Sequence, residues 1–266
     1  MSVDQYLDLA RSADQLTISP DWGQGRTTFG GLSAALALAH LQDDAGDKTL
    51  RSVNVSFCGA LKTDEPASLT RKVLRSGKSV SHLQSEVWQE GALCTQVNAC
   101  YGSERPSDIE VAHPRLITGE AGGGQRMPFI KGVTPEFTQH IGFSYVEGGL
   151  PFSSSKANHL KGWMRFNEGS GTMTDAHLLA LIDAWPPTLL QKLKGFAPCA
   201  SVTWSVEMVT PLSQTAPLQS TDWLWYEAEI RQAHHGYGHT EARIASADGT
   251  LLALSRQLVV VYDVRS

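Results

Sequence analysis

One aspartate lies alone in an apolar segment of the second half of the chain. Asp183 is the only charged side chain between Ala176 and Trp185, and leucine, isoleucine and alanine surround it. Burying an ionised carboxylate costs free energy unless it is paired or used. A carboxylate in such surroundings is a candidate general base, because burial shifts its pKa toward neutrality. The alternative is that the segment is only partly buried and that Asp183 faces water.

Three further polar side chains could hold a reacting water beside this base. Gln257 lies in a segment that is otherwise rich in leucine, valine and alanine. A buried amide needs hydrogen-bond partners, and a water or the neighbouring backbone could supply them. Ser201 and Thr203 are two residues apart in a predicted strand, so we expect them to face the same side. Either could be the hydroxyl that completes the set.

A pair of glycines opens the most apolar segment of the first half. Gly30 and Gly31 stand where a helix should begin, and a helix start has free backbone N–H groups and a positive dipole end. Such a terminus can bind the oxygen of a carbonyl substrate. Close packing of the helix also favours glycine, and the sequence leaves the two explanations open.

Other chemistries lack the residues that they need. No Gly-x-Ser-x-Gly segment is present, which disfavours a Ser-His-Asp hydrolase. Gly77-Lys78-Ser79 has Lys72 where a phosphate-binding loop needs glycine, so we interpret it as a turn. The histidines of the His234–His239 segment lie at a predicted turn and strand start and have no cysteine close by in sequence. We therefore expect no metal ion and no other cofactor.

Composition excludes several classes of protein. The 266 residues include 22 basic and 27 acidic side chains, a formal net charge of −5 that argues against nucleic-acid binding. The longest apolar runs, Gly30–Leu41 and Leu251–Tyr262, are shorter than the ~20 residues of a membrane-spanning helix. The first residues lack the basic region of a secretory signal, so we expect a cytoplasmic protein. Its four cysteines show no C-x-x-C pairing, which favours reduced, buried thiols.

The elements that must position these residues occur twice. Each copy has a predicted apolar helix followed by four strands with alternating polar and apolar residues and matched turns. The helices are Gly30–Leu41 and Asp175–Leu190, the second of which should kink or end at its prolines 186 and 187. The strands are Ser52–Phe57, Ser68–Arg75, Ser81–Gln89 and Leu93–Tyr101 in the first copy, and Ser201–Val206, Trp223–Arg231, Tyr237–Ala245 and Leu251–Tyr262 in the second.

This duplication predicts an α+β protein in which two antiparallel sheets each wrap a buried helix and pair as a pseudo-dimer. We expect one repeat over residues 1–115, a linker over 116–158 with a few short strands, and the second repeat over 159–266. The first helix contains no acidic residue, and the second lacks the glycine pair. A site formed where the halves meet should therefore occur once per chain.

The order of these segments resembles the double-hotdog acyl-CoA thioesterases, the acyl-CoA thioesterase II-like family. The resemblance rests on Thr28-Phe29-Gly30-Gly31-Leu32, Val73–Ser79, the helix with Asp183, the strand Ala200–Glu207 and Gly249–Gln257. It implies a tandem hotdog fold and hydrolysis of acyl-CoA. It also implies that Asp183, Ser201 and Gln257 hold the hydrolytic water.

Two other functions remain open. A hotdog hydratase or dehydratase usually needs an Asp and a His working together, and only His177, six residues from Asp183, could serve. A catalytically silent acyl-CoA or lipid binder would not need Asp183 at all. The chain could also form homo-oligomers, although the duplication already supplies the pairing that single-hotdog chains obtain by dimerising.

Overall fold

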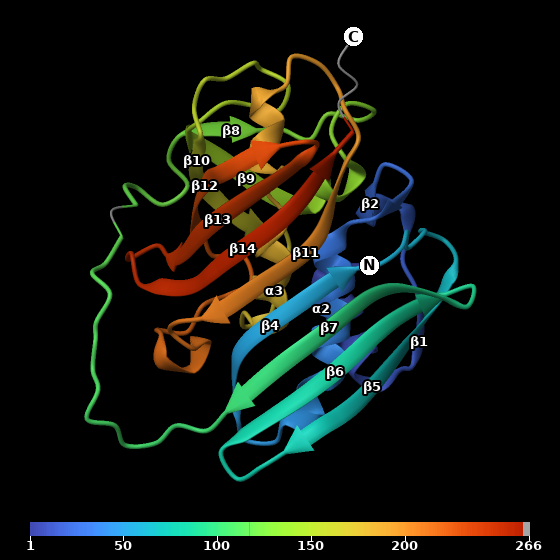
Figure 1. Cartoon of the computed structure of the whole chain (residues 1–266), viewed down its shortest axis with the longest axis vertical. Coiled ribbons are helices and arrows are strands. Elements are labelled where there is room, and N and C mark those ends of the chain that lie inside the picture. The colour runs from blue at the N-terminus through green and yellow to red at the C-terminus, as the bar shows by residue number, and fades with distance from the viewer. Residues whose placement is uncertain (117, 263–266) are drawn as a thin grey trace.

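The computed structural model describes residues 1–116 and 118–262, which form a 12-stranded antiparallel sheet with helices packed behind it and a separate two-stranded sheet of β2 and β3 (Figure 1). The α-helices are α1 (Val3–Ser12), α2 (Gly30–Leu41) and α3 (Asp175–Ile182). The first-half strands are β1 (Gln15–Thr17), β2 (Gly23–Gln24), β3 (Thr27–Thr28), β4 (Thr49–Phe57), β5 (Pro66–Ser76), β6 (Val80–Gln89) and β7 (Ala92–Gly102). The second-half strands are β8 (Gln125–Met127), β9 (Ile141–Glu147), β10 (His159–Phe166), β11 (Cys199–Met208), β12 (Leu224–His234), β13 (Tyr237–Ser246) and β14 (Leu251–Val261).

The sheet runs without a break across both halves. Its order is β1-β5-β6-β7-β4-β11-β14-β13-β12-β10-β9-β8, so β4 and β11 join the halves edge to edge. The sequence predicted two sheets that pair as a pseudo-dimer, whereas the structure has one continuous sheet through β4 and β11. An open strand edge leaves unpaired N–H and C=O groups, and the antiparallel pairing of β4 with β11 satisfies them on both halves at once.

All eight predicted strands and the first predicted helix are present, but the second helix is shorter than expected. It ends at Ile182 rather than at residue 190, and Asp183 is its C-terminal cap residue. The N–H of Ala184 bonds to the Leu181 carbonyl in a tight final turn. Pro186 and Pro187 then prevent further helix, because proline has no N–H to donate. A short 3-10 helix, Thr188–Lys192, follows.

Helix α2 is buried on nearly every side, as its composition predicts. Every residue from Gly31 to Leu41 is buried, and small side chains let α3 approach closely. A Cβ added at Gly31 would lie 2.8 Å from the carbonyl oxygen of Ala180. The two helices therefore meet where α2 begins and α3 approaches its end.

Helix α1, which the sequence reading did not include, ties the N-terminus to α3. Ser2 and Gln5 form a capping box at its start. The carboxylate of Asp4 lies 2.8 Å from His177 Nε2, and His177 Nδ1 lies 2.8 Å from the Thr174 hydroxyl. These bonds fix the first turn of α3 against α1.

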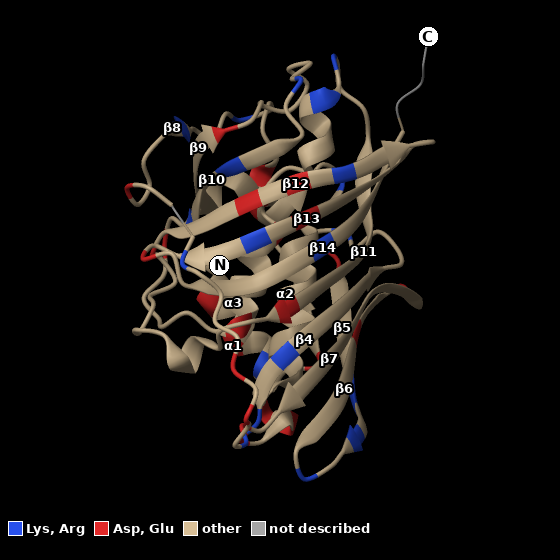
Figure 2. Cartoon of the chain, turned by 60° about the vertical axis from the view of Figure 1, so that its left-hand side comes forward, with Lys and Arg blue, Asp and Glu red and all other residues tan. Residues whose placement is uncertain are grey.

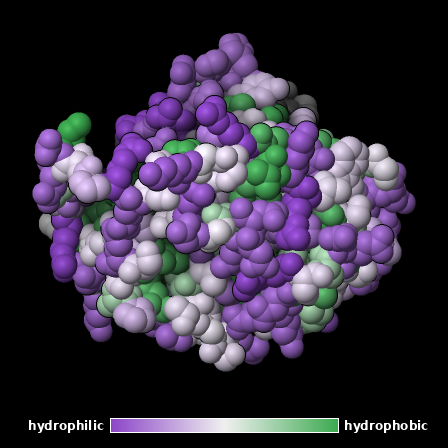
Figure 3. Space-filling model, turned by 90° about the horizontal axis from the view of Figure 1, so that it is seen from below, coloured by the Kyte–Doolittle hydropathy of each residue, from purple (hydrophilic) through white to green (hydrophobic). Residues whose placement is uncertain are grey.

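The expected linker contributes to the second half of the sheet. It contains β8 and β9, the latter close to the predicted position, and β9 pairs with β10. The boundaries of the repeats stay a prediction. All four cysteines are free, but Cys58 is exposed, contrary to the expectation of buried thiols. Within the described ranges no helix is long and apolar enough to cross a membrane, and the face in Figure 3 is mostly hydrophilic with scattered apolar residues.

Candidate active site

Asp183 lies where the end of α3 meets the start of α2. Its neighbours Ile182, Ala184 and Trp185 are all buried, whereas Asp183 itself keeps partial solvent access. A Cβ built on Gly30 would lie 3.1 Å from its Oδ2 atom, so this oxygen faces the first turn of α2. The first half of the chain, at Gly30, therefore borders a carboxylate that belongs to the second half.

An amide and a hydroxyl complete a chain of hydrogen bonds to this carboxylate. Gln257 Nε2, on β14, donates to Asp183 Oδ1 at 2.7 Å and to Ser201 Oγ, on β11, at 2.8 Å. Both hydrogens of the amide are thus used, which fixes the orientation of the Gln257 side chain. The three residues that the resemblance implied are brought together, although 74 positions separate Asp183 from Gln257.

Thr203 is not part of this cluster, and the expectation that it shares a face with Ser201 is wrong. Ser201 pairs with Val259, and Thr203 pairs with Leu258, because the register shifts between them. Val259 and Leu258 are neighbours in a regular stretch of β14 and face opposite sides of the sheet. The bulge therefore puts the Thr203 side chain on the outer face, where it is exposed.

The two glycines of α2 have different surroundings. A Cβ at Gly30 would meet Asp183 Oδ2 and the Phe57 ring, both at 3.1 Å. A Cβ at Gly31 would meet the Phe29 ring and the Ala180 carbonyl, which belong to the helix packing. Close packing therefore accounts for Gly31, whereas Gly30 borders the carboxylate.

Burial raises the pKa of Asp183 from 3.8 to about 7. Two groups oppose this shift: the hydrogen bond from Gln257 and the backbone N–H of Gly31, both of which favour the ionised form. A carboxyl group with a pKa near neutrality can take up and release a proton at physiological pH. The environment of Asp183 thus suits a general base.

Three aromatic side chains, Trp185, Tyr226 and Phe57, lie near this carboxylate. Trp185 stacks on Tyr226 at 5.4 Å between ring centroids. Burial, and then the charge of Asp183, raise the pKa of Tyr226. Phe57 approaches the same glycine that borders Asp183. Tyr226 and Phe57 belong to strands whose alternation predicted only core positions, so no local signal separated them from other buried aromatics.

The corresponding place in the other half lacks the same groups. Asp183 is the ninth residue from the start of α3, and the ninth residue of α2 is Leu38, which is buried. The repeat counterpart of Gln257 falls near Ala99. A different acid, Asp175, starts α3, and burial raises its pKa to about 6, but it lies at the other end of that helix.

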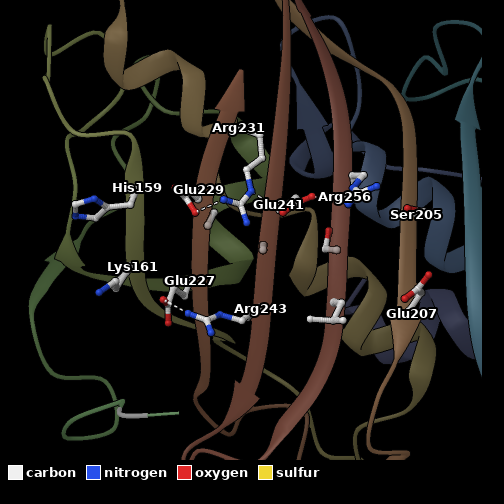
Figure 4. Close-up of a pocket in the computed structure, with 14 residues that line it drawn as sticks. His159, Lys161, Ser205, Glu207, Glu227, Glu229, Arg231, Glu241, Arg243 and Arg256 are labelled. Carbon is white, nitrogen blue, oxygen red and sulfur yellow. Dashed lines mark hydrogen bonds and ion pairs between the residues drawn. The ribbon is translucent and has the colours of Figure 1, made fainter. Parts of the chain in front are cut away.

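A charged groove lies on the outer face of the second half. Its volume is about 680 Å³, and it crosses β10, β12, β13, β14 and β11 (Figure 4). Figure 2 shows the basic and acidic bands on β12 and β13. Arg231 and Arg256 both pair with Glu241, and Arg243 pairs with Glu227. The groove contains none of the predicted site residues.

Family models match both halves of the chain. The acyl-CoA thioesterase N-terminal domain matches residues 18–102, and the acyl-CoA thioesterase C-terminal domain matches residues 121–261. The chain belongs to this acyl-CoA thioesterase family. It is therefore a thioesterase, an enzyme that hydrolyses thioesters. No curated protein sequence matches it significantly.

Solved structures share the fold of this thioesterase over nearly its whole length. A hot dog fold protein of unknown function from Alicyclobacillus acidocaldarius is 22% identical, with a TM-score of 0.81 and coverage of 98% of this chain and 99% of that one. A putative thioesterase II from Thermobifida fusca is 19% identical, with a TM-score of 0.78 and coverage of 97% and 99%. The acyl-CoA thioesterase II TesB2 from Mycobacterium marinum is 16% identical, with a TM-score of 0.69 and coverage of 100% and 99%.

Proposed function

We propose that the enzyme hydrolyses acyl-CoA thioesters with a water activated by Asp183. The observation that carries this proposal is the Asp183–Gln257–Ser201 chain of hydrogen bonds beside Gly30. The ionised carboxylate accepts a proton from the water, and the water oxygen attacks the thioester carbonyl carbon. When the C–S bond breaks, the protonated Asp183 returns a proton to the CoA thiolate. The products are a free acid and CoA.

The other residues position the reactants. The amide of Gln257, held by Ser201, orients the carboxylate and the water beside it. The N-terminus of α2 directs backbone N–H groups and its positive dipole end toward the negative charge that develops on the carbonyl oxygen. Gly30 leaves room for the thioester there, because any Cβ would meet the carboxylate and Phe57.

A hotdog hydratase or dehydratase receives less support from the site. The histidine that could have worked with Asp183 is engaged elsewhere, since His177 bonds to Asp4 and Thr174. A silent acyl-CoA binder remains the alternative that an experiment must separate. Such a protein would bind acyl-CoA with the same affinity before and after loss of the carboxylate and would release no CoA.

The test is release of CoA from a panel of acyl-CoAs by the wild-type enzyme and by Asp183→Asn. We expect turnover by the wild type and a loss of about 10³-fold in the variant, the scale that removal of a general base produces. Equal turnover by the two proteins would refute the role of Asp183. Binding without turnover by the wild type would support the silent binder instead.

A further inference from the structure

The chain between Asp183 and Ser201 leaves the candidate active site and returns to it. The side chains at its two ends both accept hydrogen bonds from the Gln257 amide, at 2.7 and 2.8 Å. Between them, the short helix Thr188–Lys192 leads into a largely exposed stretch that ends where β11 begins. Phe196, in this stretch, precedes Ser201 by five residues, which span at most about 18 Å when fully extended. The tip of this loop therefore stays near the cluster that contains Asp183.

A second loop, residues 148–156, holds this tip in place. Three of its backbone N–H groups donate to carbonyls of the first loop, in the pairs Phe152–Leu190, Ser154–Leu193 and Ser155–Gln191. The buried side chain of Gln191 adds two bonds, since its Oε1 accepts from the N–H of Gly149 at 2.8 Å and its Nε2 donates to the His159 carbonyl at 3.1 Å. The tip is thus ordered in advance, which lowers the entropy cost of binding a ligand there.

Two phenylalanine rings lie together where these loops meet. The ring centroids of Phe152 and Phe196 are 5.6 Å apart, and Phe196 is 82% exposed. Phe152 has a φ of 64°, in the left-handed region that a bulky side chain adopts only at a cost. Strained residues of this kind cluster at ligand-binding and active sites. The molecule therefore presents an aromatic surface to solvent here, held by a strained backbone.

Only basic side chains accompany these rings in sequence. Residues 148–158 and 184–200 contain Lys156, Lys192 and Lys194 but no acidic residue, in a chain of net charge −5. All three lysines are exposed, and Lys192 Nζ donates to the Lys156 carbonyl at 2.8 Å. None of the ion pairs among the described residues involves them. The arginines of the charged groove, in contrast, are paired with glutamates. The loop tip is therefore suited to an anionic ligand.

Aromatic rings beside such lysines suit a nucleotide. A base stacks on an aromatic side chain through its π-face, and a lysine ammonium binds phosphate oxygens as a point charge. An acyl-CoA carries an adenine and several phosphates at one end, and the flexible pantetheine arm connects them to the thioester. The acyl chain at the other end offers neither a base nor a negative charge.

We propose that Phe152, Phe196 and the three lysines bind the adenosine and phosphate end of CoA. The adenine stacks on the exposed ring of Phe196, with Phe152 beside it, and the lysines bind the phosphates. This inference rests on the proposed function, since it assigns the CoA part of the same substrate. It makes the loop tip a determinant of the preference for CoA thioesters, while Asp183 performs the hydrolysis.

The experiment compares kcat/KM for an acyl-CoA with that for the pantetheine thioester of the same acid. We expect the acyl-CoA to exceed the pantetheine thioester by about tenfold or more at low ionic strength, because only CoA has the base and the phosphates. This ratio should decrease as salt is added, since salt screens exposed charges. Equal kcat/KM values for the two thioesters would overturn the inference.

Two variants connect this ratio to the loop tip. Phe196→Ala should lower the ratio by about tenfold, the scale of one stacked base, and Lys194→Ala should also lower it. Phe196→Tyr keeps the aromatic face and should restore the wild-type ratio. Lys78→Ala, at an exposed lysine in the turn between β5 and β6, is the matched control and should keep that ratio. A ratio that neither Phe196→Ala nor Lys194→Ala changes would contradict the assignment.

Failure of the proposed function gives a different result. If the wild-type enzyme hydrolyses neither thioester, calorimetric titration with CoA still tests this site. Phe196→Ala should then bind CoA about tenfold more weakly than the wild type, and equal affinities overturn the inference. It is also overturned if the variants keep their affinity for CoA but lose binding to phosphatidylglycerol vesicles, which would assign the loop tip to a membrane surface instead.

Discussion

The buried carboxylate of Asp183, the proposed general base, should reduce the stability of the enzyme. Its pKa is raised from 3.8 to about 7, and at ~1.4 kcal/mol per pH unit this shift corresponds to roughly 4 kcal/mol. Because the folded-state pKa lies above the unfolded one, the protonated form stabilises the fold. That contribution is fully present below about pH 4 and is lost as the pH rises to about 7.

Replacing Asp183 by asparagine removes the charge but keeps the shape. The Asn Oδ1 atom can still accept from Gln257, whereas the amide hydrogens of the asparagine would face the N–H of Gly31. The gain in the free energy of unfolding should therefore be smaller than the roughly 4 kcal/mol that the pKa shift corresponds to. We expect the variant to be more stable than the wild type by about 1–4 kcal/mol at pH 8. This gain should shrink by roughly 2 kcal/mol between pH 7 and pH 5, since the wild-type carboxyl protonates over that range.

Urea denaturation of both proteins at pH 8 and pH 5, beside the CoA-release assay, measures the two effects together. Asp47→Asn, at an exposed aspartate outside the site, is the control and should change neither stability nor turnover. A variant that is less stable than the wild type at pH 8 would refute the view that the carboxylate is strained by burial. The same view would be refuted if the difference in unfolding free energy between the variant and the wild type were equal at pH 8 and pH 5.

Three further predictions concern the groups around Asp183. The wild-type kcat/KM should rise with pH to a plateau above about 7. Gln257→Ala should move the midpoint of this rise to higher pH, because the amide of Gln257 lowers the pKa of Asp183. A variant whose kcat/KM has the same midpoint as the wild type would contradict this prediction. Ser201→Ala should lower kcat about tenfold by freeing Gln257, whereas Thr203→Ala on the outer face should match the wild type in steady-state kinetics. Gly30→Ala should lower turnover with little change in melting temperature, and Gly31→Ala should lower the melting temperature, because only the second Cβ meets the helix backbone.

Local sequence patterns were sufficient for the strands and for the first helix. Alternation with period two depends only on neighbouring residues and on which face is buried, so each strand of the repeat could be located before its partners were known. The all-apolar composition of Gly30–Leu41 likewise required a buried helix. The order of segments then pointed to Asp183, Ser201 and Gln257, which the structure brings within hydrogen-bond distance.

What could not be predicted depends on contacts between distant segments. The bulge between Ser201 and Thr203 is defined by the register of β11 against β14, and one extra residue exchanges the faces of the sheet. The early end of α3 places Asp183 at a helix terminus, beside the start of α2. The joining of the sheets through β4 and β11 also has no local signature, because any open strand edge can pair.

Duplication explains why the two helices of this enzyme can differ so much. In a symmetric pair of halves each helix would need both a glycine at its start and an acid near its end, and burying two such carboxylates would destabilise the protein twice. Here α2 supplies Gly30 and keeps Leu38 at the position that corresponds to Asp183. The destabilising charge is thus confined to α3, and the remaining half is free to contribute apolar packing to the shared core. The low share of charged residues, 18%, fits a chain with two buried helices.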